Sequence, residues 1–337
     1  MAMAQCFLKC FGCGFLLLLS LLTGCDVFDQ DDDDDDEEVQ AIFVFGDSIS
    51  DTGNVFLATA GDIPVSPPYF DGRFSNGRVW VERLANAFDL DVDPVLDRGT
   101  NFAVGGARAS RDVEVVFDPV TLTIPSILSQ VDLFFGLRID AFFEQFLDFF
   151  VDREDADADA LYIVFAGGND IRDVVLDLDG GLGAMATINA AVANISMAIR
   201  DLADAGARMF LVPNVPNVGL SPETMAAGLE AVMQATDLTQ AFNTALQTAL
   251  DTLEAELDLT IFRLDTFALL EDAVMEPEAF GLTNVTDACL EGDEFVGGTP
   301  CENPDVHLFW DGMHATAAGH SILAEAALEV LAPVVPR

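Results

Sequence analysis

The stretch AIFVFGDS at residues 41–48 decides the fold of this chain. Its first five residues are all apolar, and Gly46 and Asp47 then end the run. A short apolar run without polar alternation is typical of a strand that is buried on both faces of a parallel sheet. Three similar runs follow along the chain, at residues 161–165, 209–212 and 259–262.

Helical patterns separate these predicted strands. Residues 188–204 are rich in Ala, Ile and Leu, and residues 222–257 form a long stretch of Ala, Leu and Gln that begins after Ser221. Strands that alternate with helices predict an α/β fold, in which helices cover both faces of a mainly parallel sheet. Because no repeat or linker interrupts the chain after residue 40, we expect a single domain at residues 41–337.

The composition excludes one large class of function. The 337 residues include 58 acidic residues against 14 Lys and Arg, which gives a formal net charge of −44. Such a chain repels phosphate backbones, so nucleic acid is excluded as a partner. The hydrophobic fraction of 51% is ample for a folded core. An acidic chain with one lysine, Lys9, also suits a salty environment, where ions screen the self-repulsion.

The N-terminus has the pattern of an export signal. Residues 1–24 contain the positive charge of Lys9 and then an apolar run at residues 15–22. This run is too short to cross about 30 Å of hydrocarbon, so it is typical of a signal peptide. It leads into LTGC, residues 22–25, which resembles the lipobox of bacterial lipoproteins. The resemblance implies cleavage before Cys25 and acylation of that cysteine; the alternative is an ordinary secretory signal.

The segment after Cys25 predicts a spacer. Ten acidic residues lie within residues 26–38, and their mutual repulsion favours an extended, solvated tether over residues 25–40. Signal, lipid and tether together predict a protein of the cell envelope that is anchored to a membrane. Asp26 resembles a retention signal for the inner membrane in some bacteria, but such rules differ between groups, so the choice of membrane stays open.

Two cysteines remain beyond residue 25, namely Cys289 and Cys301, in a stretch rich in Gly and Asp. In an exported protein such a pair most simply forms a disulfide that closes a surface loop, worth about 3 kcal/mol. Free thiols and a metal site are the alternatives, and no histidine lies between the two cysteines.

Four short segments carry side chains suited to catalysis. Ser48 follows the first predicted strand, where open α/β sheets bind their ligands, although a serine there can also cap a helix. The segment NFAVGGA at residues 101–107 contains paired glycines, which let a backbone N–H approach a ligand or simply form a turn. Asn169, in AGGND at residues 166–170, can donate a hydrogen bond into a site or cap a helix.

The fourth segment is WDGMH at residues 310–314. Asp311 and His314 are three residues apart at the entry to a terminal helix, which is the pairing that holds an imidazole ready to accept a serine proton. We expect His320 to be structural, and we assign no role to His307.

In this order the four segments resemble those of the GDSL, or SGNH, family of serine esterases and lipases, over nearly all of residues 41–337. VPNVPNVGLSP at residues 212–222 resembles the Pro-rich loop after the family's fourth strand. FWD at residues 309–311 is similar to the subgroup of plant GDSL lipases and bacterial lecithinase- or hemolysin-like enzymes. The resemblance implies a flavodoxin-like SGNH-hydrolase domain with three α/β/α layers.

The resemblance also implies a role for each matching residue. Ser48 is expected to be the nucleophile, His314 the general base and acid, and Asp311 the residue that orients His314. The oxyanion hole is expected to consist of the backbone N–H groups of Ser48 and Gly106 and the side-chain amide of Asn169. Of the two adjacent glycines, Gly106 rather than Gly105 is chosen as the donor because of its distance along the sequence from Asn101.

The implied reaction is ester hydrolysis through an acyl-enzyme on Ser48, without a cofactor or a metal, by a monomer. DLDG at residues 177–180 only superficially resembles a calcium loop, because the later ligands are absent. The substrates implied are lipid or short-acyl esters. The alternatives are a carbohydrate deacetylase or acyltransferase of the same fold, and an envelope lipoprotein that binds without catalysis.

A cluster of phenylalanines at residues 128–151 stands apart from these motifs. Its spacing between residues 142 and 150 predicts one apolar face of a helix. Such a face packs against a core, covers an acyl chain, or touches a membrane.

Overall fold

The computed structural model describes residues 39–117, 120–136, 153–293 and 295–336. The chain divides into two compact units, Met1–Asp36 and Glu37–Arg337, and all described residues belong to the second. The export signal, Cys25, most of the tether and the phenylalanines at residues 142–150 lie outside the described residues.

The centre of the second unit is a parallel sheet of four strands in the order β1-β4-β5-β6. Its strands are β1 Ala41–Gly46, β4 Ala160–Phe165, β5 Met209–Pro213 and β6 Thr260–Leu264. They lie at the four apolar runs of the sequence, within two residues at each end. On the free side of β1, the backbone of Val44 bonds to Thr100 and Phe102, so the segment around Asn101 extends the sheet.

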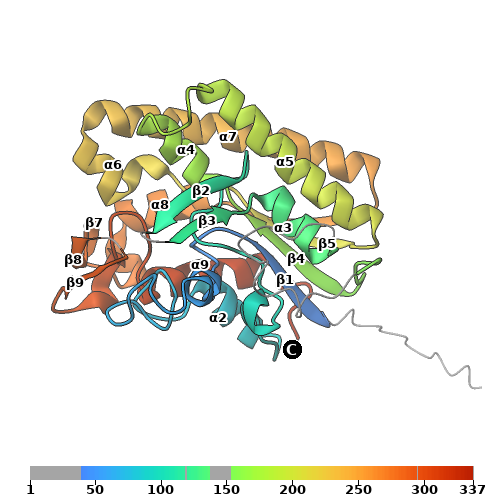
Figure 1. Cartoon of the computed structure of the whole chain (residues 1–337), viewed down its shortest axis with the longest axis horizontal. Helices are drawn as coiled ribbons and strands as arrows, with labels where there is room; N and C mark the ends of the chain where they lie inside the picture. The colour runs from blue at the N-terminus through green and yellow to red at the C-terminus, as the bar shows by residue number, and fades with distance from the viewer. Residues whose placement is uncertain (1–38, 118–119, 137–152, 294, 337) are drawn as a thin grey trace, which may run out of the picture. The chain divides into compact units, whose positions relative to one another are not determined.

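Alternate residues of the strands point to two different cores. Phe43, Tyr162 and Phe210 belong to one buried cluster, whereas Ile42, Leu161 and Leu211 belong to the other. The first cluster is covered by α3 Ile127–Phe134, α5 Ala184–Asp204 and α7 Leu229–Glu256. The second is covered by α2 Trp80–Asn86 and α9 Ala317–Val330. Figure 1 shows α5 and α7 above the sheet and α2 and α9 below it, which confirms the three-layer α/β/α prediction.

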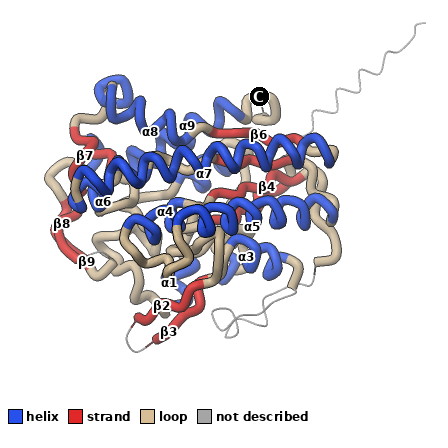
Figure 2. The backbone as a smooth tube through the Cα atoms, turned by 90° about the horizontal axis from the view of Figure 1, so that it is seen from above, coloured by secondary structure: helices blue, strands red, loops and turns tan. Residues whose placement is uncertain are grey.

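The long helices form because their apolar residues recur at helical spacing. In α5, Ile188, Ala191, Ile195 and Leu202 are buried at intervals of three, four and seven residues. Figure 2 shows α5 running beside α7 along the domain. The sequence analysis predicted one helix over residues 222–257, whereas the structure has α6 Pro222–Ala227 and then α7. The break falls at Gly228, whose φ of 103° is outside the helical region.

The remaining elements surround the carboxyl edge of the sheet. They are α1 Asn54–Ala58, α4 Gly168–Val175, α8 Thr266–Met275, the antiparallel hairpin β2 Val113–Phe117 with β3 Val120–Ile124, the parallel pair β7 Asn284–Ala288 with β10 His307–Phe309, and the antiparallel hairpin β8 Leu290–Asp293 with β9 Gly297–Pro300. None of the helices in the described ranges combines the length and apolar character needed to cross a membrane.

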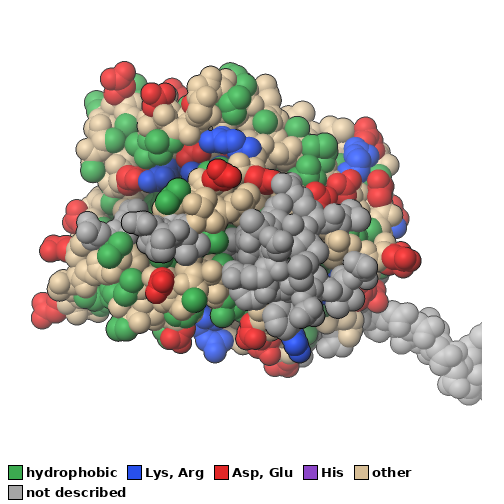
Figure 3. All heavy atoms as spheres, viewed as in Figure 1, with side chains coloured by type: hydrophobic (Ala, Val, Ile, Leu, Met, Phe, Trp, Pro, Cys, Tyr) green, Lys and Arg blue, Asp and Glu red, His purple; other side chains and the backbone are tan. Residues whose placement is uncertain are grey.

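The surface reflects the composition. On the face seen in Figure 3, Asp and Glu side chains are spread over the outline, and Lys and Arg side chains form only a few small groups.

Candidate active site

Ser48 lies in the turn directly after β1, at the carboxyl edge of the parallel sheet. Its hydroxyl oxygen is 2.8 Å from Nε2 of His314, although the two residues are 266 positions apart. Ser48 does not cap a helix, because α1 begins only at Asn54 and its first N–H groups bond to the carboxylate of Asp51. The alternative of a capping serine is therefore wrong.

His314 is held from behind by Asp311. Nδ1 of His314 lies 2.9 and 2.8 Å from the two carboxylate oxygens of Asp311, and both residues are buried. The Asp311 carboxylate also accepts the backbone N–H groups of Met313 and His314, at 2.9 and 2.8 Å. These bonds fold residues 311–314 into a tight turn that fixes the two side chains together.

The charge state of Asp311 follows from these contacts. Burial raises the pKa of this carboxyl, but the nearby His314 and the hydrogen bonds outweigh burial, so the pKa is lowered from its ordinary value. A carboxylate only accepts hydrogen bonds, so Nδ1 of His314 carries the proton and donates it. Nε2 is then left with a lone pair that faces the Ser48 hydroxyl, which is the tautomer a general base needs.

The glycine pair at residues 105–106 lies beside Ser48. The Gly105 N–H donates to the carboxylate of Asp51 at 2.8 Å, whereas the Gly106 N–H has no acceptor within the described ranges. Both positions require glycine: a Cβ on Gly105 would lie 2.3 Å from the Phe74 ring, and Gly106 has a φ of 80°. Gly106 therefore has the N–H that remains for a ligand.

Asn169 lies in the first turn of α4 and does not cap that helix, because Gly167 occupies the cap position. Its amide nitrogen donates to the carbonyl of Ala107 at 3.0 Å, which fixes the side chain against the glycine segment. The amide has two N–H bonds, and one cavity is lined by Asn169 together with Ser48, Gly106 and His314. The three predicted oxyanion donors thus come from three separate segments to one cavity.

Two further side chains brace this arrangement. Asp51 is fully buried and accepts N–H groups from Gly53, Asn54 and Gly105, so it ties the start of α1 to the glycine segment. Gln130 of α3 bonds to both backbone groups of Gly46, at 2.9 and 2.8 Å. Neither residue was predicted: Asp51 lies only three residues after Ser48, but its contact with Gly105 spans 54 positions, and the contact of Gln130 with Gly46 spans 84.

Apolar cavities open on both sides of Ser48. The first, of about 190 Å³, is called here the hairpin-side cavity, because β2 and β3 supply part of its wall. Its apolar lining consists of Val55, Ile63, Phe74, Val115, Ile124, Phe295 and Met313. The second, of about 100 Å³, is called the α8-side cavity, and its apolar lining includes Ile49, Phe165, Pro216, Val218, Leu270 and Phe309. A larger cavity of about 510 Å³ between α7 and β6 is lined by Val212 and Asn214 of the Pro-rich segment but by no residue of the four segments suited to catalysis.

Two arginines border these cavities. Arg172 lines both of them and pairs with Glu223 at 2.6 Å, and Arg108 lines the hairpin-side cavity and pairs with Asp173 at 2.7 Å. Because each guanidinium is matched by a carboxylate, the cavity walls carry little net positive charge.

Asp47, directly before Ser48, is buried and has an altered pKa. Burial raises the pKa of this carboxyl to about 6, and a hydrogen bond from the Ile49 N–H and the nearby His314 partly offset that effect. This group therefore changes its charge near pH 6, next to Ser48.

The other two histidines lie outside the Ser48 site. His320 of α9 is buried and accepts the Trp80 N–H at 3.3 Å, and burial lowers its pKa to about 3, so it stays neutral within the fold.

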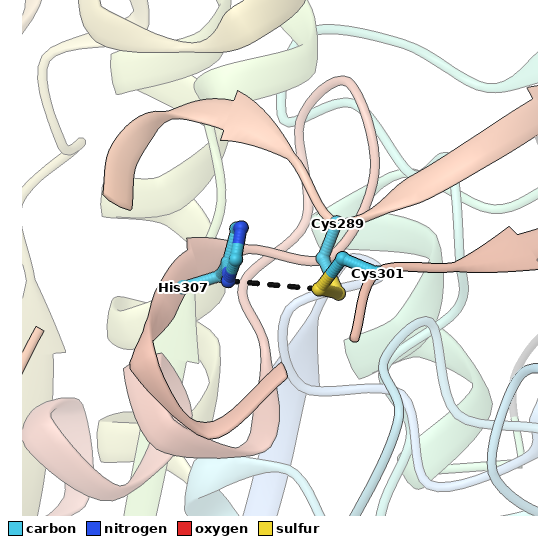
Figure 4. Close-up of side chains that lie close together, drawn as sticks. All are labelled: Cys289, Cys301 and His307. Carbon is cyan, nitrogen blue, oxygen red and sulfur yellow. Dashed lines mark hydrogen bonds between the residues drawn. A yellow bond between two sulfur atoms is a disulfide. The ribbon is translucent and has the colours of Figure 1, made fainter. Parts of the chain in front are cut away.

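Cys289 and Cys301 are joined by a disulfide, and Nδ1 of His307 lies 3.5 Å from Cys301 Sγ, as Figure 4 shows. Metal ligation requires thiolates, which disulfide sulfurs are not. Inspection of the loop alone could not reveal His307, because it lies six residues beyond Cys301.

Three aromatic residues at the site were not anticipated. Phe74 stacks on the His314 ring with centroids 5.3 Å apart, and Phe295 meets the same ring edge-on at 5.8 Å. Tyr69 donates a hydrogen bond from its hydroxyl to Asp311 Oδ2 at 2.8 Å. The signal in the sequence for two of them is weak: the Pro- and Gly-rich stretch 61–77 contains one tyrosine, Tyr69, and two phenylalanines, Phe70 and Phe74.

Hydrogen bonds join an aspartate, a histidine and a serine in series at the carboxyl edge of a parallel α/β sheet, beside N–H groups that have no acceptor among the described residues. This arrangement defines a serine hydrolase. Comparison with known families then makes the assignment specific. The chain belongs to the GDSL-like lipase/acylhydrolase family, whose sequence profile matches residues 42–327. It is a carboxylic-ester hydrolase.

Three known proteins illustrate what the chain is similar to. The chain is 29% identical to a phosphatidylcholine-sterol acyltransferase of Aeromonas hydrophila, over 86% of this chain and 78% of that protein. It is also 29% identical to a GDSL esterase/lipase of Arabidopsis thaliana, over 86% and 85% of the two chains. Among solved structures, an acetylxylan esterase from Geobacillus stearothermophilus is 14% identical, with a TM-score of 0.45 over 88% of this chain and 96% of that one.

Proposed function

We propose that Ser48, His314 and Asp311 catalyse ester hydrolysis in this chain through an acyl-enzyme intermediate. The observation that carries the proposal is the continuous set of hydrogen bonds from Asp311 through His314 to the Ser48 hydroxyl, at 2.8 to 2.9 Å. Ser48 Oγ attacks the ester carbonyl while Nε2 of His314 takes the hydroxyl proton. The same proton is then given to the leaving alcohol, and a water molecule activated by His314 releases the acid.

The negative charge that develops on the carbonyl oxygen needs donors that are already in place. We assign this role to the N–H groups of Ser48 and Gly106 and to the Asn169 amide. The Gly105 N–H already donates to the Asp51 carboxylate, so it is not available to the substrate oxygen. This bond supports Gly106 rather than Gly105 as the oxyanion donor.

The substrates that we propose are esters with an apolar acyl chain, including lipid esters. The support is the lining of the two cavities beside Ser48, where aliphatic and aromatic side chains predominate. A relative named for a phospholipid substrate, the phosphatidylcholine-sterol acyltransferase, agrees with this class. Ser48, His314, Asp311 and the three proposed oxyanion donors all belong to one chain, so the proposed chemistry requires no residue of a second copy.

Hydrolysis of p-nitrophenyl esters, from acetate to palmitate, tests this function. The full chain in detergent is expected to hydrolyse at least one ester, and Ser48→Ala is expected to lower kcat by at least about 10⁴-fold. The preferred chain length separates short-acyl from lipid substrates. Equal activity in Ser48→Ala would contradict the assignment, and no activity at any chain length would favour the alternative of a protein that binds without catalysis.

We also propose that the chain is a lipoprotein anchored through Cys25. The support is the sequence alone: an apolar run that leads into LTGC and is followed by an acidic spacer. In a bacterial host, the chain is expected to incorporate labelled palmitate and to sediment with membranes. Cys25→Ser is expected to lose the label, and unchanged labelling of that variant would contradict the anchor.

A further inference from the structure

Tyr69 connects the active site to a surface hairpin. It lies in the loop between α1 and α2, is almost fully buried, and its hydroxyl donates to Asp311 Oδ2 at 2.8 Å. The same hydroxyl oxygen accepts the backbone N–H of Phe295 at 3.3 Å. A phenol has one proton, and the Asp311 carboxylate can only accept, so the direction of both bonds is fixed.

Phe295 is placed by the hairpin of β8 and β9. The disulfide between Cys289 and Cys301 closes the base of this hairpin. The N–H groups of Cys289 and Leu290 bond to the carbonyls of Phe309 and Trp310, immediately before Asp311. The hairpin is therefore hydrogen-bonded to the end of β10 and to Trp310, the residue directly before Asp311.

Phe295, in the turn of the hairpin, also contacts the ring of His314 directly. The Phe295 ring lies edge-on to His314 and to Phe74, with centroids 5.8 and 5.4 Å apart. The Phe295 carbonyl accepts the Val65 N–H at 2.8 Å, and its backbone has a φ of 64°, which is uncommon for a residue with a side chain. Contacts on both backbone groups hold the ring in place.

We propose that Tyr69 is a positioning residue for the Asp311–His314 pair, and that the disulfide-closed hairpin holds Tyr69 in register through Phe295. This inference rests on the proposed catalytic roles of Asp311 and His314. The Tyr69 donor takes up one lone pair of Oδ2 and so prevents the carboxylate from rotating away from Nδ1. It also withdraws charge from the carboxylate, which limits how strongly Asp311 stabilises the protonated imidazole.

Tyr69→Phe tests the role of the hydroxyl, because it removes one oxygen atom and keeps the ring. We expect kcat for p-nitrophenyl butyrate to fall about 10-fold with little change in KM. The carboxylate then stabilises the imidazolium more strongly, so we expect the acid limb of the kcat/KM profile to move to higher pH by about half a unit.

The other tyrosine of the chain provides the control. Tyr162 of β4 donates its hydroxyl to the carbonyl of Asp157 at 3.0 Å, on the sheet and away from Ser48. Tyr162→Phe is expected to leave the pH profile unchanged even if it lowers the melting temperature. Asp47 and His320, whose pKa values His314 influences, are the same in both variants.

The hairpin is tested by the double variant Cys289→Ser/Cys301→Ser and, should that variant be unstable, by Phe295→Leu. Either is expected to move the acid limb in the same direction as Tyr69→Phe. When either change is added to Tyr69→Phe, the additional shift of the acid limb is expected to be much smaller. The reason is that Tyr69→Phe has already removed the hydroxyl that connects the hairpin to Asp311. Fully additive effects would overturn the role of the hairpin.

The rate at which Ser48 reacts with a fluorophosphonate probe gives a second readout that needs no knowledge of the substrate. Reaction of the wild type with the probe that is lost in Ser48→Ala supports the proposed function, whatever the result for Tyr69→Phe. If Tyr69→Phe then matches the wild type in rate and profile, or lowers the rate with an unchanged profile, the positioning role is wrong while the proposed function stands.

Discussion

At the scale of single residues, the chemistry depends on which N–H groups are already occupied. Asp51 removes the Gly105 N–H from the active site, and Asp311 holds the proton of His314 on Nδ1. Asn169 uses one amide hydrogen on Ala107 and keeps the other. Each of these choices is made by a single hydrogen bond, so single substitutions are expected to separate them.

Asn169→Ala removes the one side-chain donor assigned to the oxyanion hole. Because the donor is aimed at charge that exists only in the transition state, kcat is expected to fall by about 10²–10³-fold with little change in KM. Steady-state kinetics on p-nitrophenyl butyrate measures both constants. An unchanged kcat would remove Asn169 from the oxyanion hole.

Asp47 is expected to make stability depend on pH. Its pKa is raised to about 6, so the folded protein keeps this proton to higher pH than the unfolded chain does. Wild type therefore loses stability from this group as pH rises from about 4 to about 6. Asp47→Asn cannot ionise, so its unfolding free energy relative to wild type is expected to rise by about 3 kcal/mol between pH 4 and pH 7.

Denaturant unfolding at pH 4, 5, 6 and 7 measures this difference. The buried Asp51 and Asp170, whose pKa values are also raised by burial, are present in both proteins. The charge of Asp170 helps to raise the pKa of Asp47, so that interaction is part of the measured difference. A difference that stays constant across this range would contradict the raised pKa of Asp47.

At the scale of secondary structure, the strands supply a rigid edge and the loops and hairpins supply the walls of the site. β1 and α4 carry Ser48 and Asn169, whereas the hairpin β2–β3 contributes Val115 and Ile124 to the hairpin-side cavity. In a strand, neighbouring side chains point to opposite faces. Val115 accordingly lines the cavity, and Val116 is 70% exposed.

Val115→Phe is expected to shorten the acyl chain that the enzyme prefers. The larger ring fills part of a cavity of about 190 Å³, so hydrolysis of p-nitrophenyl decanoate is expected to fall about 10-fold relative to acetate. Val116→Phe is the matched control, because it adds the same ring to the exposed face of the same strand. Equal chain-length profiles for the two variants would place the acyl chain elsewhere.

At the scale of the whole molecule, acidity is the dominant property. Removing the ten acidic residues of the tether leaves 48 acidic residues against 13 arginines in residues 41–337. Several of the arginines already pair with a carboxylate, as Arg73, Arg108 and Arg172 do. Because acidic residues far outnumber the arginines, ion pairing leaves most of the negative charge uncompensated. The folded protein therefore carries a strong self-repulsion that dissolved ions can screen.

The melting temperature is expected to rise with NaCl concentration. The screening length falls from about 10 Å at 0.1 M to about 3 Å at 1 M, so most of the rise is expected below about 1 M. Thermal unfolding at constant pH from low to molar NaCl measures it. A steady fall in melting temperature with salt would contradict adaptation to a salty environment.

Much of the local structure was predictable because it has a local cause. The apolar runs at residues 41–45 and 161–165 are strands because nearly all of their side chains are apolar and are buried in the sheet. Ser48 lies at the carboxyl edge of the sheet because it follows the first run directly. The three-residue spacing of Asp311 and His314 already predicted a side-chain pair within one turn. The unpredicted helix break at Gly228 also has a local cause, because glycine adopts a positive φ without a steric penalty.

The contacts between distant segments were decided only by the tertiary structure. Ser48 meets His314 across 266 residues, Tyr69 meets Asp311 across 242, and Asp51 meets Gly105 across 54. Periodicity in a sequence reports which face of a strand or helix is buried, but not which buried faces meet. The sequence by itself therefore predicted the strands of the central sheet, the family and the candidate site residues, Gly106 among them. Only the tertiary structure showed which N–H group of the glycine pair is left without an acceptor and which aromatic residues surround His314, because both depend on contacts between distant segments.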